Sequence, residues 1–160
     1  MKRVLLLLLC LALPALAFAG TPQLLQGKDV PALLQPPAHG ERVIALWSLD
    51  CVYCEPNLAA LAKLARQHPH TLQLVVVSTD APSRQKAVAA RLQKMHLAAF
   101  TTYVYAEASP ERLNYLIDRD WGGELPHTVV IRADGKHFSF SGDGSPAQLR
   151  HVADGASNQH

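Results

Sequence analysis

Two cysteines separated by two residues, Cys51 and Cys54, lie where an apolar segment ends and a helical pattern begins. The segment 42–48 before them is almost continuously apolar, as in a strand of a parallel sheet that is covered on both faces. After them, apolar residues recur at the spacing of one helix face, namely Leu58, Leu61 and Ala65. The short spacer lets the two sulfurs close a disulfide across the first helical turn, and the helix N-terminus favours a thiolate at Cys51. The spacing therefore predicts a redox-active pair at a strand-to-helix junction.

The first residues have the three parts of a secretory signal peptide. Lys2 and Arg3 provide positive charge, residues 4–13 are apolar, and 17–19 form a small-x-small cleavage site. The apolar part is too short to span a bilayer comfortably. We therefore expect cleavage after residue 19, which also removes Cys10, rather than an uncleaved membrane anchor. The mature protein is then expected in the periplasm, without stable membrane insertion.

Charge and cysteine content exclude several classes of protein. The chain has 15 basic and 13 acidic residues, and removal of Lys2 and Arg3 leaves 13 of each. A near-neutral protein lacks the basic patch that nucleic-acid binding usually needs. A bridge between Cys51 and Cys54 closes so small a loop that it removes little unfolded-state entropy, which argues against a purely stabilising role. Structural zinc needs four ligands, and one cysteine pair without a suitably spaced histidine pair does not supply them. We expect neither a metal nor a cofactor.

Alternating strand and helix patterns fill the rest of the chain. Strands are predicted at 42–48, 72–78, 101–106, 127–132 and 137–141, and helices at 54–68, 83–96, 109–117 and 145–152. The early alternation is that of parallel β-α units, whereas the Asp-Gly turn at 133–136 predicts a hairpin. We therefore predict an α/β fold over 41–154, with a central mixed sheet and helices on both faces. An irregular, proline-rich arm at 20–40 and a flexible tail at 155–160 flank this single domain, which we expect to be a monomer.

Three features together carry a resemblance to a known family. These are the cysteine pair, Trp47 four residues before it, and Pro126 before a strand that leads into Asp134-Gly135. Over about 30–152 the chain resembles the thioredoxin superfamily, and within it the secreted TlpA/ResA type of thiol–disulfide oxidoreductase. The β-α segment at 72–96 fits that group as an insertion after the first helix.

The resemblance implies roles for the residues that match. Cys51 is the expected nucleophile, and Cys54 resolves the mixed disulfide that it forms. Pro126 is expected to be cis and to face Cys51, leaving the backbone of Leu125 free to pair with an extended substrate. Trp47 is expected to pack beneath the site.

The sequence departs from the family pattern close to the cysteines. Asp50 stands where tryptophan is common, and Tyr53 replaces the usual proline. A carboxylate beside a thiolate raises the pKa of the cysteine, so Asp50 either makes the couple more reducing or is a solvated loop acid with little effect. Tyr53 either hydrogen-bonds near the sulfurs or lines the substrate face. His127, which follows the proline, either tunes the site or is an exposed strand residue.

The function expected from these observations is exchange of the Cys51–Cys54 disulfide with disulfides of secreted proteins. Reduction is the favoured direction, with electrons from a membrane thiol reductase and with apocytochromes, in cytochrome c maturation, as one candidate substrate. One alternative is a disulfide oxidant or isomerase. An oxidant stabilises its reduced thiolate, and no lysine or arginine stands beside Cys51 in the sequence to do so. The other alternative is a non-catalytic thioredoxin-like module that binds a partner in the groove around Pro126.

Overall fold

A six-stranded sheet forms the centre of the protein. The computed structural model describes residues 20–157, so the predicted signal peptide with its Cys10 and the last residues of the tail lie outside it. The strands are β1 (Gln23–Leu25), β2 (Glu41–Trp47), β3 (Leu72–Ser78), β4 (Thr101–Tyr105), β5 (His127–Arg132) and β6 (His137–Ser141). The helices are α1 (Val30–Leu33), α2 (Cys54–Gln67), α3 (Gln85–Lys94), α4 (Pro110–Ile117) and α5 (Pro146–Ser157), with 3-10 turns at Gly27–Asp29 and Pro82–Arg84.

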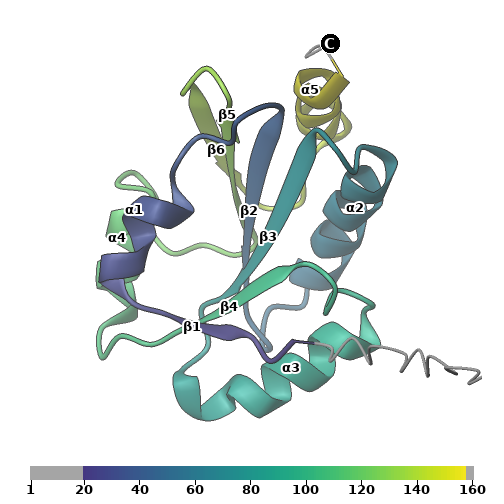
Figure 1. The fold of residues 1–160 in the computed structure, drawn as a ribbon. Coiled ribbons are helices and arrows are strands. Elements are labelled where there is room, and N and C mark those ends of the chain that lie inside the picture. Colours follow the sequence, from purple (N-terminus) through teal and green to yellow (C-terminus); the bar gives the residue numbers. More distant parts are fainter. Residues whose placement is uncertain (1–19, 158–160) are drawn as a thin grey trace, which may run out of the picture.

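The strand order is β1-β4-β3-β2-β5-β6. The first four strands in that order run parallel, and β5 and β6 are antiparallel to their neighbours. Helices α2 and α5 cover one face of the sheet and α1 and α4 the other, while α3 crosses below them (Figure 1). The predicted mixed sheet with helices on both faces is confirmed. Within the described residues, no helix combines the length and apolarity needed to cross a membrane.

Each face of the sheet has its own apolar core, which explains why β2 is apolar from Val43 to Trp47. On β2, Val43, Ala45 and Trp47 pack with α2, α3 and α5, whereas Ile44 and Leu46 pack with α1 and α4. Successive side chains of a strand point to opposite faces, so a strand covered on both sides needs apolar residues at every position. The continuous pattern at 42–48 was therefore a correct guide to a central strand.

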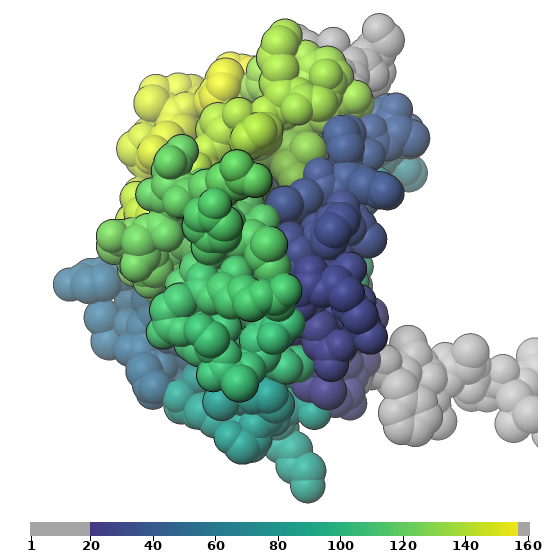
Figure 2. Space-filling model, turned by 90° about the vertical axis from the view of Figure 1, so that its left-hand side faces the viewer, coloured from purple at the N-terminus to yellow at the C-terminus, as the bar shows by residue number. Residues whose placement is uncertain are grey.

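The segment 20–40 is not the irregular arm that the sequence predicts. Its residues 23–25 form β1, which pairs in parallel with β4, and its residues 30–33 form α1. The backbone of Gly27 donates a hydrogen bond to the Glu107 carboxylate (2.6 Å), and Arg42 donates to three carbonyl oxygens at the end of α1. Figure 2 shows this purple segment lying against the green residues that include α4. These long-range contacts make it an integral part of the domain.

The end of the domain also lies later than predicted. Helix α5 continues to Ser157, past the boundary expected at 154. Ala156 is buried in the α2-side core, and Gly155 lies against the buried side chain of Glu41. The helix extends because these residues pack, so a flexible tail does not begin at 155.

Candidate active site

The fold gathers the candidate residues at one edge of the sheet. Trp47, the last residue of β2, pairs with Ser78, the last residue of β3, because those strands are parallel. Strand β5 runs the other way, so its first residue, His127, pairs with Leu46. The loop to Cys51, the turn after β3 and the residue Pro126 before β5 therefore all emerge at the same edge.

Cys51 and Cys54 form a disulfide at the start of α2, with their Cα atoms 5.4 Å apart. Cys54 is fully buried in the α2-side core, whereas Cys51 is partly exposed. Since Cys54 begins α2, the positive end of the helix dipole lies at the pair and favours negative charge on sulfur. Only one sulfur of the pair is therefore open to a partner, and it lies at the positive end of a helix.

Val52 and Tyr53 form the exposed rim of the disulfide. Their exposed fractions are 79% and 65%, which is unusual for such apolar side chains. Trp47 lies beneath the site, 1% exposed, and its indole nitrogen has no hydrogen-bond partner among the described residues. Tyr53 thus lies on the outer face and Trp47 in the core.

The Leu125–Pro126 peptide bond is cis. Pro126 is buried, and its carbonyl oxygen accepts a hydrogen bond from the backbone of Gly142 at 2.8 Å. Leu125 is partly buried and packs against the cores of both faces. Pairing of the Leu125 backbone with a substrate remains a prediction.

Asp50 is an exposed acid, but it is not a free one. Arg84 donates two hydrogen bonds to its carboxylate, at 2.6 and 3.2 Å, and these bonds hold the pKa of Asp50 below its ordinary value. Arg84 also pairs with the buried Asp80 at 2.7 Å, and Asp80 accepts hydrogen bonds from the backbone of Leu49 and from Ser78. The loop that leads to Cys51 is thereby tied to the turn after β3.

A second arginine lies beside the cysteines. Arg91 of α3 forms an ion pair with Glu55 and lines the same surface hollow as Cys51. No lysine or arginine stands next to Cys51 in the sequence, as stated above. In the folded protein, however, Arg91 lies in the same hollow as Cys51, so the conclusion that no basic residue is near Cys51 is wrong. A sequence signal for these arginines was present, because Arg84 and Arg91 are seven residues apart and would share one face of the helix predicted at 83–96.

His127 is buried, and it is not the exposed strand residue that remained one alternative. Its ring is 3% exposed and stacks on Trp121, with ring centres 4.5 Å apart. Its Nε2 lies 3.0 Å from the Asp118 carboxylate and its Nδ1 lies 2.8 Å from the hydroxyl of Ser141. A carboxylate can only accept, so Nε2 carries the proton and Nδ1 accepts from Ser141.

These contacts and the burial of the cluster shift the pKa values of its two titratable groups, His127 and Asp118. Burial lowers the pKa of His127, and the neighbouring Asp118 offsets part of that effect. Partial burial would raise the pKa of Asp118, but hydrogen bonds from Ser139, the Asp120 backbone and His127 hold it below its ordinary value. The ring therefore ties the loop after α4 to β6, directly beside Pro126.

Asn57 is a buried polar residue that the sequence analysis passed over. It lies three residues after Cys54 on the buried face of α2, next to Leu58 and Leu61. Its amide donates to the Thr128 hydroxyl (3.4 Å) and accepts from the Gly144 backbone (3.3 Å). An asparagine within an apolar helical stripe was the available sequence signal.

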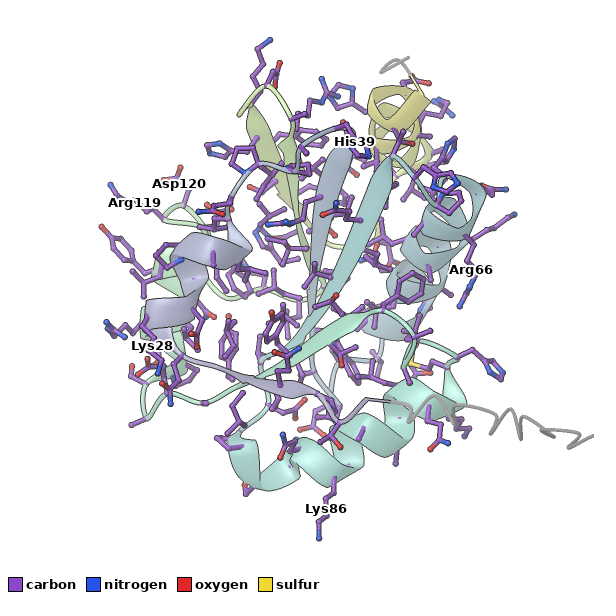
Figure 3. All side chains as sticks on the ribbon, in the orientation of Figure 1. Lys28, His39, Arg66, Lys86, Arg119 and Asp120 are labelled. Carbon is purple, nitrogen blue, oxygen red and sulfur yellow. A yellow bond between two sulfur atoms is a disulfide. The ribbon has the colours of Figure 1, made fainter. Side chains whose placement is uncertain are left out.

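A hollow larger than the one at Cys51 lies elsewhere on the described part of the chain. It has a volume of about 870 Å³ and is lined by the early parts of β3 and β4, away from the edge that carries the cysteines. Its walls include Lys28 and Arg66, but Figure 3 shows these two side chains on opposite sides of the domain. They do not converge on a ligand. Over residues 20–157, no three histidine, cysteine or acidic side chains gather into a possible metal site.

Comparison with known proteins places the fold. No model of a protein family matches the sequence, and no curated protein matches it. The structure is similar to a secreted Mycobacterium tuberculosis disulfide oxidoreductase homologous to E. coli DsbE, with a TM-score of 0.54 and 20% identity over 79% of this chain and 84% of that one.

Two further solved structures are similar to the same degree. A thioredoxin-related protein from Neisseria meningitidis serogroup B gives a TM-score of 0.56 at 19% identity, over 74% of this chain and 86% of that one. A thiol:disulfide interchange protein of the thioredoxin family from Chlorobium tepidum gives 0.56 at 18%, over 78% and 83%. At such identities the likeness establishes the fold, which is thioredoxin-like. The predicted fold class is confirmed.

Proposed function

We propose that this protein is a thiol–disulfide oxidoreductase that works through Cys51 and Cys54. The observation that carries the proposal is the unequal exposure of the two sulfurs, with Cys51 open at a helix N-terminus and Cys54 fully buried behind it. An enzyme of this kind needs one sulfur that meets the substrate and one that reacts only afterwards. The similar solved structures that are named as disulfide oxidoreductases or interchange proteins support the same activity.

Reduction of a substrate proceeds in two exchange steps. The Cys51 thiolate attacks one sulfur of the substrate disulfide, a bond forms between them, and the other substrate sulfur leaves as a thiolate. Cys54, once deprotonated, attacks the Cys51 sulfur, closes the intramolecular disulfide and expels the remaining substrate sulfur. Two electrons and two protons pass from the enzyme to the substrate, and the reverse sequence would donate a disulfide.

Reduction is the direction that we favour. An oxidant strongly stabilises its reduced thiolate, for which unpaired positive charge beside the sulfur is one means. Here Arg84 is bound to Asp50 and Asp80, and Arg91 is bound to Glu55. The two guanidinium groups thus face three carboxylates, so the surroundings of Cys51 carry no net positive charge from these pairs.

We also propose a compartment and partners, on the basis of the sequence and its resemblance to secreted oxidoreductases. The signal-like segment 1–19 and the secreted similar protein from M. tuberculosis support a place in the cell envelope, specifically the periplasm. Disulfides of secreted proteins would be the substrates, with apocytochromes as one candidate. A membrane thiol reductase would return electrons to the Cys51–Cys54 disulfide, and the enzyme would act as a monomer.

The reduction potential of the couple tests the direction. Equilibration of the mature domain with dithiothreitol or glutathione should give a potential of about −250 mV or lower, in the range of thioredoxin. A value of about −120 mV would make the protein a disulfide donor instead.

Substitution of the cysteines tests the activity itself. Cys51→Ser should abolish reduction of a protein disulfide, whereas Cys54→Ala should retain the first step and trap partners as mixed disulfides on Cys51. The double variant is the control for trapping. Undiminished binding of a partner to the double variant, with no turnover by the wild type, would favour a non-catalytic binding module.

A further inference from the structure

A hollow between α2 and α3 opens directly at Cys51. It has a volume of about 680 Å³. Its walls are mostly apolar and consist of Leu49, Val52, Pro56, Ala59 and Met95. The ion pair between Arg91 and Glu55 provides its only charged groups. We call this hollow the α2–α3 groove.

The groove lies on the side of Cys51 away from Pro126. Strand β3, which leads into α3, and strand β5, which follows Pro126, flank β2 on opposite sides. The proline side and the groove are therefore two separate surfaces, and Cys51 is part of the lining of the groove.

We propose that the α2–α3 groove receives an aliphatic or aromatic side chain next to the reacting cysteine of the substrate. This inference rests on the proposed function and adds a substrate preference to it. The occupant follows from chemistry, because the mixed disulfide on Cys51 holds the neighbours of the substrate cysteine within a few ångströms of the groove. Burial of apolar surface on both sides favours an apolar side chain there over a polar one.

The charged pair also bears on which residues the groove favours. Arg91 and Glu55 are paired with each other, so the groove carries no net charge that would attract a charged substrate side chain. The groove thus favours neither acidic nor basic neighbours of the substrate cysteine. An extended, apolar-flanked cysteine is a feature of segments that become buried once a protein has folded, so the preferred substrate is an incompletely folded chain.

Two cyclic disulfide peptides test the preference. They share one sequence, except that leucine flanks both cysteines in the first and serine in the second. The second-order rate constant for oxidation of the reduced protein is measured with each peptide and with hydroxyethyl disulfide, a small disulfide that does not fill the groove. We expect the leucine peptide to react about tenfold faster than the serine peptide, the factor for removal of roughly half a leucine side chain from water.

Ala59→Gln and Ala60→Gln form a matched pair of variants. Ala59 is exposed on the groove wall, whereas Ala60 lies on the side of α2 that faces α5. Ala59→Gln places an amide in the groove and should reduce the leucine-to-serine rate ratio to within twofold, while Ala60→Gln should retain it. The ratio is independent of any change in the general reactivity of Cys51.

Equal rates of the two peptides with the wild-type protein would overturn the groove assignment and leave the oxidoreductase activity standing. A ratio unchanged in Ala59→Gln would overturn it as well. Failure to react with hydroxyethyl disulfide and with both peptides would instead overturn the proposed function, and the inference with it.

Discussion

Replacement of His127 tests whether the buried histidine cluster holds the segment that ends at Pro126. His127→Phe retains a ring that can stack on Trp121 but removes both hydrogen bonds, and His127→Ala removes the ring as well. The bond to the Asp118 carboxylate is worth roughly 1.5–3 kcal/mol, and the stacked pair roughly 0.5–1.5 kcal/mol. Asp118 keeps other hydrogen-bond donors and Ser141 is exposed, so the cost of unpairing them lies at the low end.

We therefore expect losses in unfolding free energy of about 1.5–2 kcal/mol for His127→Phe and about 3–4 kcal/mol for His127→Ala, the latter including the cavity left by the ring. Urea unfolding followed by circular dichroism, with the disulfide intact, measures both. Losses below about 0.5 kcal/mol in both variants would show that the hydrogen bonds and the stack do not stabilise the domain, and would refute the reasoning.

The destabilisation caused by these substitutions should depend on pH. Because the folded-state pKa of His127 is lowered from 6.5, the unfolded chain binds its proton first, and stability is lost as the pH falls below that value. Other groups also titrate, so the informative quantity is the difference between the wild type and His127→Phe. The cost of the substitution should shrink between pH 7 and pH 5. A cost that is constant over this interval would contradict the assigned shift.

Two further predictions concern packing and charge around the sheet. In Gly155→Ala the new Cβ would lie 1.7 Å from the Oε1 of Glu41, which is buried and bonded to Arg132, so we expect a loss of about 2–3 kcal/mol in urea unfolding; a loss below 0.5 kcal/mol would contradict this packing. Arg84→Gln leaves Asp50 unpaired near Cys51 and should raise the thiol pKa of reduced Cys51 by about 0.5, measured by the pH dependence of alkylation; a fall in that pKa would be inconsistent with the assigned role of Asp50.

The sequence was a good guide wherever a structural element depends on its own neighbours. The apolar run before the cysteines and the helical spacing after them correspond to β2 and α2, because a doubly covered strand and an amphipathic helix have distinct local periods. Strand β1 was not predicted, because three residues are too few to show a hydrophobic period and its pairing partner, β4, lies about 80 residues away in the sequence. The flexible tail was likewise predicted to begin at residue 155, but contact with Glu41 keeps Gly155 within α5.

The residues of the candidate site also fall into those that the sequence predicts and those that depend on distant contacts. The cysteines were evident from their spacing, and the position of Pro126 came from a resemblance to known proteins. The basic residues were missed because they reach the site only through the parallel pairing of β2 with β3, which places α3 beside Cys51. Burial of His127 was missed because its cover is Trp121, in a glycine-rich loop whose path no local pattern specifies.

The hydrogen bonds of Asn57 connect a second pair of segments at the site, and they differ from those of the His127 cluster in their dependence on pH. Its amide joins the start of α2 to Thr128 and Gly144, and an amide does not change charge with pH. Acid should therefore loosen the residues before Pro126 while the scaffold of the cysteine pair stays closed. Amide hydrogen exchange at mildly acidic pH would show this as two opening events of unequal free energy, with residues 118–126 opening first and the first turns of α2 remaining protected until the domain unfolds.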